Sequence, residues 1–117
     1  MKLRLQSSEL RLRLSQSDVE RLAKAGRVEE TIGFAPGQSL EYAIEARPAA
    51  EISAGFDGKR IEVTLPLERV ADWAASEQTG IEWSGESLKI LIEKDFQCLH
   101  KGAKDSDAFP NPLMDKF

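Results

Sequence analysis

The chain has 117 residues, a length that allows one domain of ordinary size and excludes two. Hydrophobic residues make up 41% and charged residues 31%, a balance that excludes disordered and collagen-like chains and predicts a globular core. Sixteen Lys and Arg against twenty Asp and Glu give a net charge of −4, which argues against a nucleic-acid partner because nucleic acids bind basic surfaces.

Charge is unevenly distributed along the chain. Residues 1–27 hold seven basic and three acidic residues, a net charge of +4, so the remaining residues carry −8. This segment is interpreted either as ordinary solvated surface charge or as a basic patch for an anionic partner.

Leucines and basic residues alternate over residues 2–14. Such a period of two is typical of a β-hairpin with one buried face. We expect its turn near residues 6–8, with Arg4 opposite Glu9.

A helix of about ten residues is predicted next, because Ser17 and Glu20 have the spacing of a capping box. Gly26 is the predicted stop, since a glycine suits the left-handed position that ends many helices. A second helix is predicted over residues 67–77, beginning after Pro66.

Six further strands are predicted from apolar runs and turn residues. The strongest turn signal is Asp57-Gly58, which is typical of a tight hairpin. The predicted strands cover residues 28–34, 40–46, 52–56, 61–65, 81–83 and 88–93.

Together these elements predict an α+β fold in which a ββαββ unit occurs twice, over about residues 1–47 and 51–95. Residues 10–28 resemble residues 61–79 after a shift of 51, which supports an internal duplication. Two short helices cannot cover eight strands laid flat, so we expect eight mostly antiparallel strands in one strongly curved or barrel-like sheet. The chain is predicted to be a single domain over residues 1–117 with an irregular C-terminal tail over residues 96–117.

The single Cys98 excludes an internal disulfide, which fits a reducing compartment. No apolar run has the length of a secretory signal or of a membrane helix. We therefore expect a cytoplasmic protein with no membrane partner.

Catalytic motifs are weak throughout. No glycine-rich phosphate loop follows a predicted strand, and we expect no cofactor. Cys98, His100 and Asp105 are side chains of the types that bind zinc, although the paired spacing of a structural zinc site is absent. The alternative is a buried Cys98 beside an exposed His100. The chain is therefore predicted to be a non-enzyme, with a hydrolase of phosphorylated substrates as the alternative.

Charged residues on the polar faces of the predicted strands form the candidate ligand-binding surface. Its alternative interpretation is the ordinary solvent face of a half-buried antiparallel sheet. The candidate residues are Arg4, Arg11, Arg13, Glu41, Glu45, Arg47, Lys89 and Glu93.

Two resemblances follow from motif and topology. The run Glu93-Lys94-Asp95-Phe96 with Cys98-Leu99, followed by Phe109-Pro110-Asn111-Pro112, resembles the closing signature of a small bacterial family of uncharacterised proteins. This resemblance covers nearly the whole chain and implies no known activity.

The βαβββ order, read from the second predicted strand, is similar to the CYTH-like triphosphate-tunnel fold, whose members bind triphosphates and divalent metal in a charged barrel. The alternating Glu-x-Glu-x-Lys signature of that fold is replaced here by Lys2-x-Arg4-x-Gln6. The sequence thus predicts a non-enzymatic binding module for an anionic small molecule or a protein partner, monomeric or homodimeric. The alternative is a CYTH-like hydrolase or binder of phosphorylated substrates.

Overall fold

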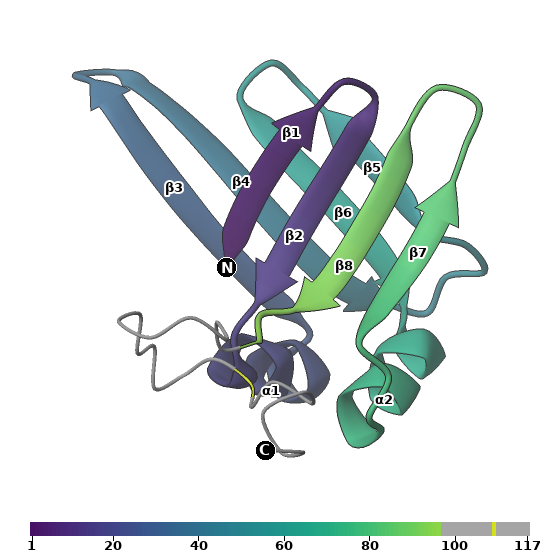
Figure 1. Ribbon diagram of the computed structural model, residues 1–117. Helices are drawn as coiled ribbons and strands as arrows, with labels where there is room; N and C mark the ends of the chain where they lie inside the picture. Colours follow the sequence, from purple (N-terminus) through teal and green to yellow (C-terminus); the bar gives the residue numbers. More distant parts are fainter. Residues whose placement is uncertain (97–108, 110–117) are drawn as a thin grey trace. The chain divides into compact units, whose positions relative to one another are not determined.

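The computed structural model describes residues 1–96 and residue 109 (Figure 1). Over these residues the protein is an α+β structure of eight strands and two helices in the order ββαββββαββ. The strands form two separate four-stranded sheets. Four of the six strand pairings are antiparallel and the two central ones are parallel.

Sheet A has the strand order β1-β2-β8-β7 (Figure 1). Its strands come from the two ends of the chain, and β2 pairs in parallel with β8. They are β1 (Lys2–Gln6), β2 (Glu9–Leu14), β7 (Gly80–Ser84) and β8 (Lys89–Lys94).

Sheet B has the strand order β3-β4-β6-β5, with a parallel pairing between β4 and β6 at its centre. All four strands lie between the two helices in the sequence. They are β3 (Arg27–Ala35), β4 (Gln38–Arg47), β5 (Ser53–Phe56) and β6 (Arg60–Pro66).

The prediction of one curved or barrel-like sheet is wrong. Each four-stranded sheet keeps two open edges, β1 and β7 in sheet A and β3 and β5 in sheet B. Over the described residues the sheets are not closed into a barrel. The physical reason is the parallel central pairing, which joins the inner strands of two hairpins and leaves the outer strand of each hairpin at an edge.

Helix α1 (Gln16–Ala25) starts two residues earlier than a cap at Ser17 implies. The Ser15 hydroxyl accepts a hydrogen bond from the Asp18 amide at 3.3 Å, and the Asp18 carboxylate accepts one from the Ser15 amide at 3.1 Å. Ser15 and Asp18 therefore form the reciprocal cap that was predicted for Ser17 and Glu20. Gly26 follows the last turn with φ +83°, as predicted.

Helix α2 (Leu67–Ala75) begins directly after Pro66, as predicted. The Pro66 backbone is extended, with φ −60° and ψ 135°, so proline ends β6 and starts the helix. Val70 and Trp73 are the buried residues of α2, which contacts β6 and β4.

The apolar core follows the period of two in the central strands β2, β6 and β8. In β2 and β8 the alternate leucines and isoleucines are buried, and most of the residues between them are charged. In β4 the buried Tyr42, Ile44 and Ala46 alternate in the same way, and the small Ala43 between them is buried as well. The side chains buried in the central strands are Leu10, Leu12, Leu14, Ile90 and Ile92 in sheet A, and Tyr42, Ile44, Ile61, Val63 and Leu65 in sheet B.

The chain divides into two compact units, one built around each sheet. The unit of sheet B comprises Met1 and Glu20–Gln78, and the unit of sheet A comprises Lys2–Val19 and the described residues from Thr79 onward. Each sheet therefore presents its own polar face, and the two faces are described separately below.

Candidate functional site

Sheet A carries five of the eight candidate residues. Arg4 lies on β1, Arg11 and Arg13 on β2, and Lys89 and Glu93 on β8. They alternate with the leucines and isoleucines of these strands, so they share the polar face of the sheet. We call this surface the polar face of sheet A, and its charged residues are Lys2, Arg4, Glu9, Arg11, Arg13, Glu82, Lys89 and Glu93. It holds five basic side chains and three carboxylates.

The β1–β2 hairpin places like charges directly opposite each other. Arg4 pairs with Arg11 and Lys2 pairs with Arg13, so the predicted pairing of Arg4 with Glu9 is wrong. The two-residue turn consists of Ser7 and Ser8, with Ser7 at φ +52°. It lies one residue further along the chain than the pairing of Arg4 with Glu9 requires, which moves the register of β2 by two residues. Like charges in directly opposed positions destabilise a sheet, so this arrangement has a folding cost.

Carboxylates offset part of this repulsion. Glu93 lies 3.2 Å from Nε of Arg11 and 4.0 Å from Nε of Arg13. Glu9 lies 3.5 Å from Arg11. The Glu82 carboxylate on β7 lies 2.9 Å from Nζ of Lys89 on β8 and accepts a hydrogen bond that raises the pKa of this lysine.

Arg4 has a different environment from the other arginines of this face. Its guanidinium donates a hydrogen bond to the Gln6 side-chain oxygen at 2.7 Å, and its side chain is exposed. Within the described part of the chain, Arg4 has no carboxylate partner. It is therefore an exposed basic group of this face whose charge is not neutralised by a carboxylate of the described residues.

Sheet B carries the other three candidate residues, Glu41, Glu45 and Arg47, all on β4. The eight candidates therefore do not share one sheet face as the sequence analysis proposed. The reason is the strand order, which pairs β8 with β2 and β4 with β6 rather than placing all four strands in one sheet.

The polar face of sheet B is organised around Arg27, which the sequence analysis missed. Its guanidinium nitrogens lie 2.8 Å from Glu62, 3.0 Å from Glu45 and 3.2 Å from Glu29. The hydrogen bond to Glu62 is the main cause of a raised pKa of Arg27. Because three carboxylates lie within 3.2 Å of this guanidinium, its charge is already neutralised. Arg27 is therefore poorly suited to bind an anion.

Arg60 and Glu41 form the second ion pair of this face. Nη2 of Arg60 lies 2.9 Å from Oε2 of Glu41, and the hydrogen bond raises the pKa of Arg60. In the sequence, the only indication that Arg60 could face β4 is its position shortly after the predicted turn at Asp57-Gly58. Together these contacts indicate that sheet B has a self-neutralised face, whereas sheet A keeps an excess of positive charge.

A family of unknown function (DUF7009) matches residues 1–113. The chain belongs to this family. That membership agrees with the resemblance to an uncharacterised family and assigns no activity. No curated protein and no solved structure matches the chain. The resemblance to the CYTH-like fold is not confirmed.

The metal prediction lies outside the described residues, because Cys98, His100 and Asp105 all fall within residues 97–108. Among the residues that are described, no group of three or more His, Cys, Asp or Glu side chains could hold a metal ion. Likewise, none of the described helices is long and apolar enough to cross a membrane.

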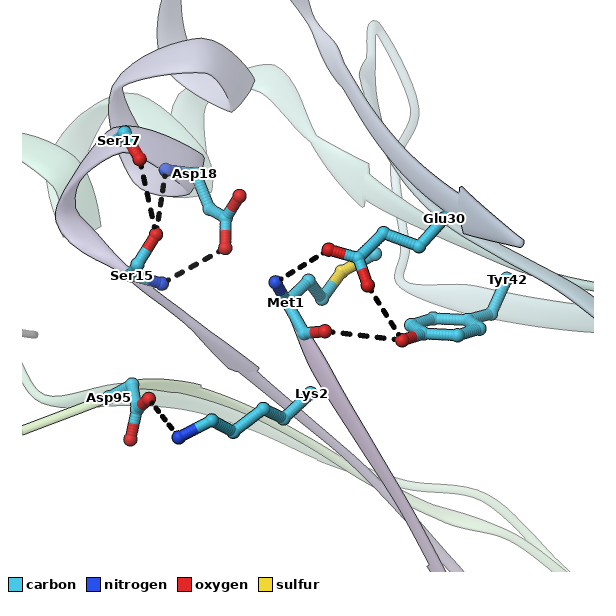
Figure 2. A network of polar contacts seen from close by, with 8 residues as sticks. All are labelled: Met1, Lys2, Ser15, Ser17, Asp18, Glu30, Tyr42 and Asp95. Carbon is cyan, nitrogen blue, oxygen red and sulfur yellow. Dashed lines mark hydrogen bonds and ion pairs between the residues drawn. The ribbon is translucent and has the colours of Figure 1, made fainter. Parts of the chain in front are cut away.

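A set of polar contacts holds the N-terminal residues (Figure 2). The Met1 amine lies 2.9 Å from Oε1 of Glu30, and the Tyr42 hydroxyl donates to Oε2 of the same carboxylate at 2.8 Å. In sheet A, Lys2 Nζ lies 2.8 Å from Oδ2 of the buried Asp95. Lys2 is thus paired with a carboxylate. The exposed arginines of the polar face are Arg4 and Arg13.

Phe109 is anchored to the residues that follow β8. Its amide donates a hydrogen bond to the Asp95 carbonyl at 2.7 Å, and its ring centroid lies 5.9 Å from that of Phe96. Nζ of Lys94 lies 5.4 Å from the Phe109 centroid, within the range of a cation–π contact. These contacts anchor Phe109 to the residues that follow β8.

Phe109→Ala is expected to lower the free energy of unfolding by about 1–2 kcal/mol, because the substitution removes a half-buried ring together with its aromatic and cation–π contacts. Urea unfolding followed by circular dichroism measures the change. Phe56→Ala is the matched control, since the Phe56 side chain is 65% exposed and its removal should change stability by less than about 0.5 kcal/mol. Equal effects of the two substitutions would contradict the anchor.

Proposed function

We propose that the protein is a non-enzymatic binding module that binds an anionic ligand on the polar face of sheet A. The observation that carries the proposal is the pair of like-charge positions on β1 and β2, Lys2 opposite Arg13 and Arg4 opposite Arg11. A sheet built for stability alone would place a carboxylate opposite each cation, as sheet B does with Arg60 and Glu41. A stability cost that serves binding is a common feature of functional surfaces.

Arginine is suited to this task because its planar guanidinium makes two parallel hydrogen bonds to a carboxylate or phosphate group. Arg4 supports the proposal most directly, since its guanidinium donates to the neutral Gln6 side chain and has no carboxylate partner among the described residues. A bound anion would also lie near Arg11, directly opposite on β2, and would relieve the repulsion between the two arginines.

The test measures two properties of the Arg4→Thr variant, its affinity for an anion and its free energy of unfolding. Tripolyphosphate and a hexaglutamate peptide serve as anionic probes in isothermal titration calorimetry. We expect the substitution to weaken binding about tenfold, the effect of losing one charge-assisted hydrogen bond. The same substitution should raise the free energy of unfolding by about 0.2–1 kcal/mol, because it removes a like-charge pair and introduces a good strand residue.

Arg47→Thr is the matched control, because Arg47 is an exposed arginine on sheet B. It should leave the affinity for both probes unchanged. Failure of the unaltered protein to bind either probe at millimolar concentration would overturn the proposal. A loss of stability in Arg4→Thr would show instead that the arginine has a structural role.

We also propose that the fold arose by duplication of a ββαββ unit. Each β2–β8 pair of sheet A corresponds to a β6–β4 pair of sheet B when 51 is added to the number of the β2 residue and 48 is subtracted from that of its β8 partner. For example, the pair Leu12 and Ile92 corresponds to the pair Val63 and Ile44. Leu3 and Leu12 likewise become Ala54 and Val63. The two sheets therefore have the same strand order when the halves of the chain are exchanged, and the β1–β2 and β2–β8 pairings have the same register as the β5–β6 and β6–β4 pairings.

A further inference from the structure

The outer edge of β3 is the least protected strand edge in the described part of the protein. Proteins normally protect sheet edges with short strands, charged side chains or prolines, since an open edge presents unpaired backbone groups to other chains. The other three edge strands follow this rule. β1 carries Lys2 and Arg4, β5 has only four residues, and β7 has five residues and contains Glu82.

β3 has nine residues, and its second half lacks such protection. Residues 31–40 contain no charged side chain, although charged residues make up 31% of the chain. Residues 31–38 are all exposed, including Ile32 at 41% and Phe34 at 69%. Figure 1 shows β3 at the margin of its sheet, with β4 on one side and no strand on the other.

Gly33 lies at the centre of this uncharged segment. A Cβ atom at this position would meet nothing within 4 Å, so the fold of one chain does not require a glycine here. A glycine inside a strand commonly marks a place where another backbone approaches closely. A register shift against β4 between Gly33 and Ala35 also leaves Phe34 without a cross-strand partner on that side.

We propose that β3 pairs antiparallel with β3 of a second copy of this chain, about a twofold axis at Gly33. This register places Ile32 opposite Phe34 of the second copy, an aromatic and β-branched pair of the kind that stabilises sheets. It also places Glu30 opposite the turn residue Pro36 rather than opposite another carboxylate. A twofold contact must be self-complementary, and an uncharged strand meets that requirement without like-charge repulsion.

The occupant is a second copy rather than a charged peptide, because the segment offers no charge for a charged partner to recognise. Pairing would join two copies of sheet B into one eight-stranded sheet. The polar face of sheet A takes no part in this contact, so the inference stands apart from the proposed anion binding.

The experiment is a charge-swap at the twofold axis, measured by sedimentation equilibrium from low to high micromolar concentration. Gly33→Lys and Gly33→Glu each place two like charges opposite each other and should weaken self-association about fivefold or more. An equimolar mixture of the two variants should form a heterodimer tighter than either homodimer. Gly33→Thr, which adds a good strand residue without charge, should retain the dimer.

Circular dichroism and urea unfolding verify that each variant remains folded, as the open space around Gly33 leads us to expect. A protein that is monomeric at every concentration would overturn the inference. So would a dimer whose affinity is the same in Gly33→Lys, Gly33→Glu and the unaltered chain, because its interface would lie elsewhere. Equal weakening by Gly33→Thr and Gly33→Lys would also overturn it, since charge at the axis would then have no role.

Discussion

Replacement of Trp73 by alanine is expected to lower the free energy of unfolding by about 3–5 kcal/mol, the range for a large aromatic side chain removed from a core. The Trp73 side chain is fully buried, with 0% of its surface exposed, and it lies on α2, which contacts β6 and β4. The cost therefore includes both the lost burial of the ring and the remaining cavity.

Urea unfolding followed by circular dichroism measures this change without relying on tryptophan fluorescence. Leu67→Ala is the matched control on the same helix, because the Leu67 side chain is 46% exposed and its loss should cost less than about 1 kcal/mol. Trp73→Phe should have an intermediate effect, since it keeps most of the apolar volume. A Trp73→Ala cost as small as that of Leu67→Ala would show that α2 does not hold the core together.

Local sequence patterns predicted the elements well because their causes are local. Alternation of leucine with arginine defines β1 and β2 within a few residues, and Pro66 sets the start of α2 by its fixed φ and missing N–H. The shift of the α1 cap from Ser17 to Ser15 is a small error of the same local kind. Both serines precede an acidic residue by a helical turn, and only the register of the buried stripe selects between them.

Strand partners were not predictable in the same way. The parallel pairing of β2 with β8 joins Leu12 to Ile92, residues that no turn connects. Any buried apolar strand of suitable length could take that place, so sequence alone does not distinguish one eight-stranded sheet from two sheets of four. The position of each candidate site residue depends on this choice, which is why the predicted surface is divided between two sheets.

The polar faces differ more than the cores do. Under the exchange of halves, Arg11 corresponds to Glu62 and Glu93 corresponds to Glu45. In sheet A these positions hold an arginine beside a carboxylate, whereas in sheet B they hold two carboxylates joined by Arg27. The proposed duplication thus retained the buried side chains, which packing restricts, and altered the surface charges, on which binding depends.

Ile44→Ala is expected to lower the free energy of unfolding by about 2–5 kcal/mol, because the Ile44 side chain is 0% exposed at the centre of sheet B. Ile44→Val is its control and should cost only about 0.5–1.5 kcal/mol, since it removes a single methyl group. We further expect the substitution to shift the unfolding of sheet A, as a single cooperative domain requires.

The physical reason for this coupling is chain connectivity. Sheet B is formed by one continuous segment, whereas the central pair of sheet A joins β2 to β8 across residues 15–88. When sheet B is folded, fewer residues between β2 and β8 remain flexible. The loop that must close when these two strands pair is then shorter. By the logarithmic dependence of loop entropy on length, this shortening favours sheet A by about 1 kcal/mol.

The two tryptophans provide the readout, since Trp73 lies in the unit of sheet B and Trp83 lies on β7 of sheet A. In a Trp73→Phe background fluorescence reports sheet A, and in a Trp83→Phe background it reports sheet B. Ile44→Ala should move the urea midpoint to lower concentration in both backgrounds, with the fluorescence and circular dichroism transitions remaining coincident. A midpoint that moves only in the Trp83→Phe background would show that the two units unfold independently, and the single-domain prediction would then be wrong.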